Sequence, residues 1–186
     1  MKRRDFKIFK KIPTLNTPRL ILRKIQLSDL NDVFEYASDP LVTEFLTWYS
    51  HKTSEYTDSY LKFLQKLYRK GRFYDWGIES NGKMIGTVGF TSIVLKDNSA
   101  EIGYVINKAF WGNGIAAEAI NEILKFGFCI LKLDRIFARI ISENKRSERV
   151  LLKCNFQKEN SEDMTIKGVR KKVYKFYIDK ETYFKE

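Results

Sequence analysis

Residues Trp111–Ala119 have the sequence WGNGIAAEA and connect two apolar runs that differ in period. The run before them, Glu101–Ile106, predicts a strand, and the run after them, Ile115–Leu131, predicts a helix. The first turn of a helix exposes unpaired backbone N–H groups and the positive end of the helix dipole. Gly112 and Gly114 allow the backbone to turn sharply and to approach a ligand closely. A phosphate or pyrophosphate fits this arrangement, and so does an ordinary tight loop before a core helix.

Length and composition indicate one folded domain. The chain has 186 residues, of which 44% are apolar, and this suffices for a sizeable core. No stretch approaches the roughly 20 consecutive apolar residues that a membrane-spanning helix needs. Residues 1–5, MKRRD, lack the apolar core of a secretory signal. We therefore expect a soluble, cytoplasmic protein that contacts no membrane.

The charge balance is strongly basic, with a net charge of +11. Residues 1–11 carry six basic side chains and one acidic side chain, which leaves five net positive charges in this segment. We interpret residues 1–13 as a basic N-terminal arm and residues 14–186 as the folded domain. A basic balance favours an anionic ligand, nucleic acid or a ribonucleoprotein. No zinc-finger or aromatic-strand signature is present, so direct nucleic-acid binding is not expected.

Cysteine and histidine usage argues against a metal site and a thiol nucleophile. The only cysteines, Cys129 and Cys154, do not form a CxxC pattern, and His51 is the only histidine. Both thiols are predicted to pack as small apolar groups. His51 follows an aromatic segment that starts at Phe45 and fits either the wall of a substrate pocket or a core flap. We expect no metal ion.

Hydrophobic periodicity along the chain predicts an α+β domain. Strands are predicted at residues 19–25, 73–79, 83–90, 100–106, 133–141, 156–160 and 169–178, the last two being joined by a charged connector. Helices are predicted from Ser28 to Asp39, and at residues 54–70, 115–131 and 146–154. Asn81-Gly82 signals a type I′ hairpin turn, and Gly86 with Gly89 indicates a bulge or a close backbone approach. The expected sheet is mixed and mostly antiparallel, with about seven strands and about four helices.

Three segments together resemble the GNAT superfamily of acyl-CoA-dependent N-acetyltransferases. Thr17–Arg23, TPRLILR, is similar to the opening strand of the branch that acetylates the N-terminal alanine of ribosomal proteins. Glu101–Tyr104, followed by Phe110–Ala116, is similar to that branch's coenzyme strand and pyrophosphate loop. Asn144–Ser147, followed by Leu151–Phe156, is similar to its asparagine and terminal "LGF" signature. The order of the three segments is far more specific than any one of them.

The resemblance extends over residues 14–180 and includes two departures. Trp111 stands where the superfamily commonly has Gln or Arg, and Trp at this position is frequent in this branch. The loss of the Gln or Arg side chain matters little if backbone amides bind the ligand. Asn155 stands where "LGF" has glycine, and Asn tolerates the left-handed conformation best after Gly. We therefore expect a single GNAT-like domain.

The resemblance implies acetyl-CoA as cosubstrate, bound where the coenzyme strand splays from the strand after the long helix. The pantetheine arm would pair with the coenzyme strand, and the pyrophosphate would bind the N–H groups that open the helix. The coenzyme-binding residues so implied are Tyr104, Val105, Ile106, Trp111, Gly112, Asn113, Gly114, Ile115, Ala116, Ala117 and Asn144. Lys145, Arg146 and Arg149 fit either added positive charge near the phosphates or a solvated surface.

Attack of an amine on the thioester needs a proton acceptor, an oxyanion donor and a proton for the departing thiolate. Glu101 is our predicted acceptor, and a solvent-facing strand residue is the equal alternative. Asn144 resembles the residue that holds the pantetheine or a water, and an N-cap is the alternative. Ser147 fits a hydrogen bond to the sulfur region or a polar first-turn position. The oxyanion donor would be a backbone N–H near Val105–Ile106, and Tyr104 is a candidate proton donor.

The acceptor amine is open at this point. The resemblance favours the N-terminal α-amine of a protein, a ribosomal protein in particular, and it is compatible with a homodimer. A polyamine or an aminoglycoside is the rival acceptor within the same enzyme class. A protein that holds CoA without catalysis, or that associates with the ribosome, belongs to a different class.

Overall fold

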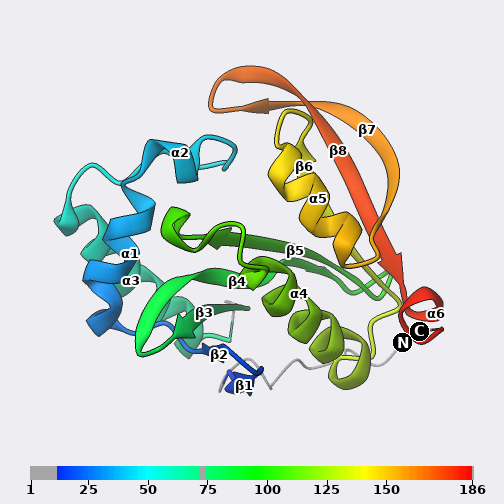
Figure 1. The fold of residues 1–186 in the computed structure, drawn as a ribbon, viewed down its shortest axis with the longest axis horizontal. Helices are drawn as coiled ribbons and strands as arrows, with labels where there is room; N and C mark the ends of the chain where they lie inside the picture. Colours follow the sequence, from blue (N-terminus) through cyan, green and yellow to red (C-terminus); the bar gives the residue numbers. More distant parts are fainter. Residues whose placement is uncertain (1–11, 72–73, 186) are drawn as a thin grey trace.

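The computed structural model describes residues 12–71 and 74–185, which form one twisted eight-stranded sheet with helices on both faces (Figure 1). The strand order is β1-β2-β3-β4-β5-β6-β8-β7. The strands are β1 Leu15–Asn16, β2 Ile21–Arg23, β3 Asp75–Ser80, β4 Lys83–Val94, β5 Ser99–Ile106, β6 Arg135–Ile141, β7 Gln157–Ile166 and β8 Val169–Asp179. The helices are α1 Leu30–Ala37, α2 Pro40–Thr43, α3 Ser54–Arg69, α4 Ile115–Lys125, α5 Lys145–Lys153 and α6 Lys180–Tyr183.

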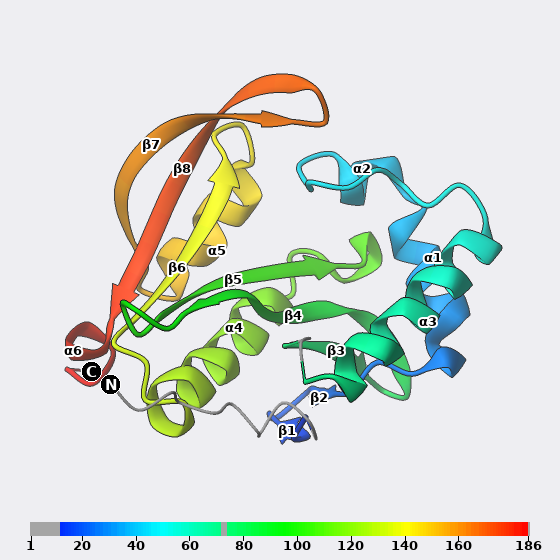
Figure 2. The ribbon, with the colours of Figure 1, turned by 180° about the vertical axis from the view of Figure 1, so that it is seen from behind.

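The sheet opens between β5 and β6. These strands are the parallel pair of an otherwise antiparallel order, and they are paired only from Ser99↔Arg135 to Glu101↔Phe137. Beyond Glu101, β5 stays with β4 while β6 continues along β8, so the two strands diverge (Figures 1 and 2). Their divergence creates a gap in the middle of the sheet, beside the start of α4.

Two hydrophobic cores cover the two faces of the sheet. On one face, Trp76 of β3 belongs to a large core with Ile120 of α4. On the other face, Met84 of β4 belongs to a core with Tyr36 of α1 and Leu64 of α3. We call these the α4 core and the α1–α3 core. The α4 core supports the loop that precedes α4, and the α1–α3 core supports the opposite side of the same gap.

The predicted fold class is confirmed, with more elements than expected. The additions are β1 and the four-residue helices α2 and α6, which are too short to show a period. The long helix is α-helical to Lys125 and continues as a π-helical turn over Phe126–Ile130. The predicted strand at 19–25 is shorter, Ile21–Arg23.

Several local predictions are confirmed or corrected by the backbone. Asn81 and Gly82 both have positive φ, 50° and 77°, as a type I′ turn requires. The register shift beside Gly86 is the predicted bulge, and Asn155 has a left-handed φ of 62°. The helix predicted to start at Ser28 starts at Leu30, because Ser28 lies inside a 3-10 turn, Leu27–Asp29, that precedes α1.

The basic arm was predicted at residues 1–13. Of these residues, the structure describes only the last two. Within residues 12–71 and 74–185, no helix has the combined length and apolarity that a membrane crossing requires.

Candidate active site

A cavity of about 480 Å³ lies against the part of β5 that does not pair with β6. It is bounded by α2, β5, the loop into α4, the start of α4 and one side of α5. The lining residues are Leu41, Val42, Phe45, Leu46, Tyr104, Val105, Ile106, Phe110, Trp111, Gly112, Gly114, Ile115, Ala116, Ala117, Asn144, Arg146, Ser147, Arg149, Val150 and Lys153. Such a volume is typical of small-molecule sites.

The start of α4 presents backbone donors to this cavity. Gly112 and Gly114 have positive φ, 82° and 75°, which side chains other than glycine rarely adopt. The N–H of Glu118 bonds the carbonyl of Gly114 at 3.0 Å and so begins the helical series. The N–H groups before it have no partner within the helix, and the helix dipole adds positive potential there. This geometry favours an anionic group at the helix start.

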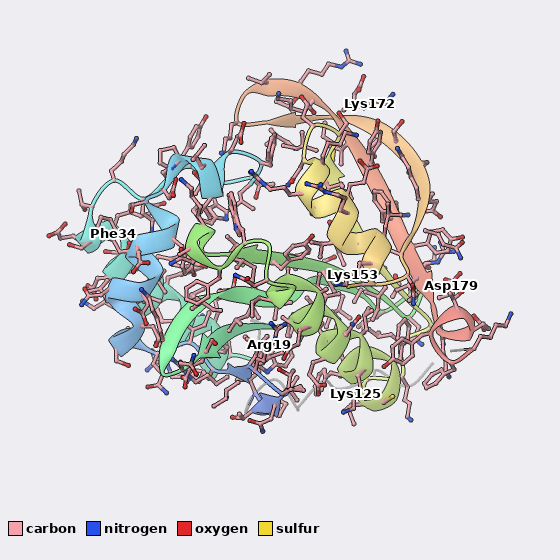
Figure 3. All side chains as sticks on the ribbon, viewed as in Figure 1. Arg19, Phe34, Lys125, Lys153, Lys172 and Asp179 are labelled. Atoms are coloured by element: carbon pink, nitrogen blue, oxygen red, sulfur yellow. The ribbon has the colours of Figure 1, made fainter. Side chains whose placement is uncertain are left out.

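A network from the first strand region holds this loop in place. The guanidinium of Arg19 donates to the carbonyl of Asn113 at 2.9 Å and to the carboxylate of Glu118 at 2.6 Å (Figure 3). Thr17 donates to the same carboxylate at 2.5 Å. Burial opposes ionisation of Glu118, but the hydrogen bonds from Thr17 and Arg19 outweigh it, so its pKa lies below the ordinary value. The Thr-x-Arg pattern therefore fixes the loop on its side away from the cavity.

Helix α5 supplies the positive charge of the cavity wall. Arg146, Arg149 and Lys153 line the cavity, and Lys153 lies at the end of α5 (Figure 3). The Arg146 guanidinium lies 4.1 Å from the centroid of the Trp111 ring, which is cation–π geometry. Lys145 instead pairs with Glu148 at 2.9 Å on the surface. Of the two alternatives, Arg146 and Arg149 thus fit the cavity and Lys145 fits the solvated surface.

Tyr104 and Ser147 meet across the cavity. The Tyr104 Oη and Ser147 Oγ atoms are 2.6 Å apart. Burial raises the pKa of the Tyr104 phenol, which the hydrogen bond with Ser147 only partly offsets, so the phenol keeps its proton at neutral pH. Asn144 lines the cavity and also caps α5, because its Oδ1 accepts from the Ser147 N–H at 3.1 Å.

Two of the predicted site residues do not line the cavity. Glu101 is the last residue of β5 that pairs with β6, and Arg139 of β6 donates to its two carboxylate oxygens at 2.9 and 2.7 Å. These two hydrogen bonds are the main reason why the pKa of Arg139 is raised. Glu101 therefore carries a permanent cationic partner, and its role as proton acceptor stays a prediction. Asn113 turns its side chain back to the carbonyls of Phe110 and Trp111.

The sequence did not predict α2 as a wall of the cavity. Asp39 caps this short helix by accepting from the Leu41 N–H at 2.8 Å, and Pro40 occupies its first turn. Asp39 ends the helix predicted from Ser28, although an N-cap followed by proline, as in Asp39-Pro40, also signals a helix start. The aromatic segment that starts at Phe45 does contribute to the cavity, through Phe45 itself.

The remaining reactive side chains are packed. His51 is buried, its Nδ1 lies 2.8 Å from Thr57 Oγ1, and burial lowers its pKa. Burial raises the pKa of the Cys154 thiol to about 11, and Cys129 is half-buried. Among the described residues, no group of three or more His, Cys, Asp or Glu side chains is arranged to hold a metal ion.

The chain is similar to acetyltransferases in each comparison with known proteins. The model of the acetyltransferase (GNAT) domain family matches residues 19–157. An uncharacterized N-acetyltransferase of Bacillus subtilis, YoaA, is 39% identical over 149 residues, which are 79% of this chain and 84% of that protein. The spermidine N(1)-acetyltransferase of Vibrio cholerae is 25% identical over 174 residues, 89% of this chain and 95% of that protein.

Solved structures share the same fold. A GNAT-family acetyltransferase from Bacillus anthracis has a TM-score of 0.81 at 26% identity, over 91% of this chain and 99% of that one. RimL, a ribosomal L7/L12 alpha-N-protein acetyltransferase solved with coenzyme A, has a TM-score of 0.76 at 18% identity, over 91% and 99%. The helix-start amides, the open space at Gly112 and the basic α5 wall fit a coenzyme with phosphate groups. The chain belongs to the GNAT acetyltransferase family and is an N-acetyltransferase that uses acetyl-CoA.

Proposed function

We propose that this enzyme acetylates the N-terminal α-amine of a protein. The observation that carries the proposal is the chemistry of the cavity wall. Among the described residues that line it, the charged side chains are Arg146, Arg149 and Lys153, and no Asp or Glu is present. A polyamine carries several positive charges, and no carboxylate of this lining would pair with them. A peptide N-terminus carries one ammonium group and brings apolar and backbone surface as well.

The α2 side of the cavity suits a peptide. Leu41, Val42, Phe45 and Leu46 form an apolar wall opposite the basic face of α5. Such a wall can pack against the first side chain of a protein, while the backbone of the acceptor finds hydrogen bonds nearby. RimL acts on a ribosomal protein, which makes ribosomal proteins the first acceptor pool to examine. The relative that acts on spermidine supports the rival acceptor.

Different residues of the chain have different proposed roles in the acetyl transfer. Acetyl-CoA supplies an acetyl group activated as a thioester. Backbone amides at the start of α4 would bind the anionic phosphates, and the backbone of β5 beyond Glu101, which does not pair with β6, would offer hydrogen bonds to an extended ligand. The protonated Tyr104 phenol, held by its hydrogen bond with Ser147, would give a proton to the departing sulfur.

An acceptor panel tests the proposal. Thiol release from acetyl-CoA is measured with peptides that begin with Ala or Ser, with spermidine, and with proteins extracted from ribosomes. The matched control is the Ala peptide with a blocked N-terminus and an internal Lys, which offers an ε-amine alone. We expect turnover with the free peptide and none with the blocked one, with mass spectrometry placing the acetyl group on the α-nitrogen. Turnover of spermidine without turnover of any peptide would refute the proposal.

A further inference from the structure

A further hollow, of about 440 Å³, lies between α3 and the segment that follows β2. Helix α3 lies at the surface, in front of β3 (Figure 2). The hollow shares no lining residue with the cavity at β5. Four of its described lining residues are basic and none is acidic: Lys24, Leu27, Lys62, Gln65, Lys66 and Arg69. Positive charge therefore gathers at a place well apart from the active site.

Hydrogen bonds fix the two sides of this hollow relative to each other. The side-chain amide of Gln65 donates to the carbonyl of Ile25 at 2.8 Å. The N–H of Ile25 in turn donates to the Tyr68 Oη atom at 3.2 Å. The Nζ atom of Lys24, the residue before, lies 5.2 Å from the centroid of the Tyr68 ring, which is cation–π geometry. The charge of Lys24 is thus held against α3.

Nearby carboxylates do not neutralise the hollow. Asp29 and Glu79 both pair with Arg23, and Asp58 pairs with Lys62 at 2.6 Å. Three cations of the hollow form no ion pair with any described carboxylate: Lys24, Lys66 and Arg69. Their charge is therefore available to an anionic partner.

The dipole of α3 explains only part of this arrangement. Cations are favourable at the carboxyl end of a helix, and Lys66 and Arg69 lie in the last turn of α3. The dipole does not explain Lys24, which belongs to another segment and lines the same hollow. Two segments that bring unpaired cations to one hollow indicate a site for an anion.

Exposed aromatic rings lie beside these cations. Phe63 is 54% exposed and precedes Lys66 by three residues, so the two side chains are neighbours on α3. Tyr56, 61% exposed, lies two turns earlier on the same helix. Single-stranded nucleic acids bind to such surfaces, because cations pair with phosphates and aromatic rings stack on bases. An acidic peptide would pair with the cations and leave the rings without a stacking partner.

The length of the basic edge also suits a nucleic-acid strand. At 1.5 Å per residue, Lys62 and Arg69 lie about 10 Å apart along the axis of α3. A stacked strand carries one phosphate per about 3.4 Å, so this edge matches about three successive phosphates.

We propose that single-stranded RNA binds in this hollow, with its phosphates on Lys24, Lys66 and Arg69 and a base stacked on Phe63. The net charge of +11 favours the approach of a polyanion. The sequence does not predict nucleic-acid binding, because it lacks the known signatures, whereas this site consists of two segments that meet only in the fold. The choice of RNA over DNA rests on the proposed function, because ribosomal proteins occur together with RNA.

Fluorescence anisotropy with a labelled 12-nucleotide oligouridine provides the first test, and it needs no turnover. Each phosphate contact of a single strand adds about −0.7 to the slope of log K against log salt, so three contacts predict a slope of at least about −2. Lys66→Ala/Arg69→Ala removes two contacts, so the slope should weaken by about 1.4 and Kd should rise about tenfold or more. An unchanged slope in this double variant would overturn the inference.

The matched control is Lys96→Ala/Lys172→Ala, which removes the same charge from two exposed lysines outside the hollow. Its slope and Kd should stay close to those of the unsubstituted protein. Both double variants should keep the affinity for coenzyme A, because neither changes a residue of the cavity at β5. Equal weakening of RNA binding in both would mean that net charge alone attracts RNA, and it would refute the site.

Phe63→Ala tests the contact with a base. The Kd for oligouridine should rise about fivefold or more, the lower end for one stacked base. An abasic oligomer of the same length, which has phosphates but no bases, should bind equally to the variant and to the unsubstituted protein. Phe184→Ala is the control, because Phe184 of the C-terminal segment is 55% exposed and lies outside the hollow. If Phe63→Ala bound oligouridine unchanged, no base would stack there.

Other polyanions decide the class of partner. Labelled polyglutamate of the same length offers carboxylates, and vesicles that contain phosphatidylserine offer lipid phosphates. We expect both to bind about tenfold or more weakly than oligouridine at the same salt concentration. Equal affinity for polyglutamate would assign the hollow to an acidic protein, equal affinity for vesicles would assign it to a membrane, and either would overturn the RNA assignment. If no amine in the acceptor panel is acetylated, the proposed function fails while these binding measurements still decide the role of the hollow.

Discussion

Gly114 forms the left-handed N-cap of α4 at the wall of the cavity. Replacing it with Glu would place a carboxylate at the proposed phosphate site and strain a backbone with φ of 75°. We expect Gly114→Glu to weaken coenzyme A binding by roughly 100-fold or more, measured by calorimetry.

The control for this change is Gly168→Glu in the β7–β8 turn. Gly168 has a similar φ of 78° and open space around it, so it carries the same backbone strain away from the cavity. Gly168→Glu should lose stability to a similar extent and keep its affinity for coenzyme A. Equal affinity in the two variants would show that the start of α4 does not hold the phosphates.

The burial of Asp75, the first residue of β3, predicts a dependence of stability on pH. Its pKa is raised from 3.8 to about 7, so the folded state binds a proton between about pH 4 and pH 7 that the unfolded state releases. The free energy of unfolding should therefore fall as pH rises through this window and level off above it, by a few kcal/mol at most. Urea unfolding at pH 5 and pH 8 should show a smaller fall in Asp75→Asn than in Asp97→Asn, the matched change in an exposed turn. Equal falls in both variants would contradict a raised pKa.

Some site residues could be predicted from the sequence, and others could not, for physical reasons. Asn144 stands at the start of a short amphipathic helix, so its N-cap alternative could be stated from spacing alone. The partner of Glu101 could not be predicted, because Arg139 is 38 residues away and meets it only through the pairing of β5 with β6. The hollow at Lys24 likewise depends on α3 and the segment after β2 together.

Among the elements, predictability follows the strength of the apolar pattern. The helix predicted at residues 54–70 is α3, Ser54–Arg69, because its buried positions repeat at helical spacing. The charged connector predicted after residue 160 is instead part of β7, which extends to Ile166. Most β7 side chains are exposed, so no alternation of apolar residues marked the strand. Pairing with β8 rather than burial defines it.

The loop before α4 depends on an element far from it in sequence. Arg19 precedes β2 and bonds both the Asn113 carbonyl and the Glu118 carboxylate. Arg19→Ala removes both bonds and lets the loop amides reorient, so we expect the Kd for coenzyme A to rise about tenfold, which corresponds to about 1.4 kcal/mol. Arg19→Lys should restore only part of the affinity, because a Lys side chain lacks the forked geometry of guanidinium.

Arg170→Ala is the control for this prediction. Arg170 pairs with Asp163 on the β7–β8 hairpin through two bonds of 3.2 and 2.9 Å, so its loss also removes one guanidinium–carboxylate contact. Its coenzyme affinity should match that of the unsubstituted enzyme. If Arg19→Ala bound coenzyme as tightly as Arg170→Ala, the network around Glu118 would not organise the loop.

Across the whole molecule, the site depends on contacts that a linear pattern does not contain. The divergence of β5 and β6 follows from three paired residues and from the competing partners of each strand, and only the family resemblance indicated it. The β7–β8 hairpin arches past α5 and ends beside α2 (Figures 1 and 2). At its tip, the Lys167 ammonium donates to the Thr43 carbonyl at 2.7 Å, across 124 residues of sequence.

This hairpin contact predicts that α2 is held in place from outside its own segment. Tyr49 also donates to the Lys167 carbonyl, at 3.2 Å, so the tip bonds the last residue of α2 and the segment that follows it. Lys167→Ala removes the bond to Thr43, and we expect faster amide hydrogen exchange in residues 41–46 and a loss of about 1 kcal/mol of stability. The KM for the acceptor should rise, while the Kd for coenzyme A, whose proposed site is at α4 and α5, should not.

Lys172→Ala is the matched change, because Lys172 is an exposed lysine of the same hairpin (Figure 3). It removes the same charge without touching α2, so exchange in residues 41–46 should stay as in the unsubstituted protein. A difference confined to Lys167→Ala would mean that the hairpin tip and α2 act together as one wall of the acceptor side. Identical exchange in both variants would mean that α2 keeps its position through Val42 and the α1–α3 core alone.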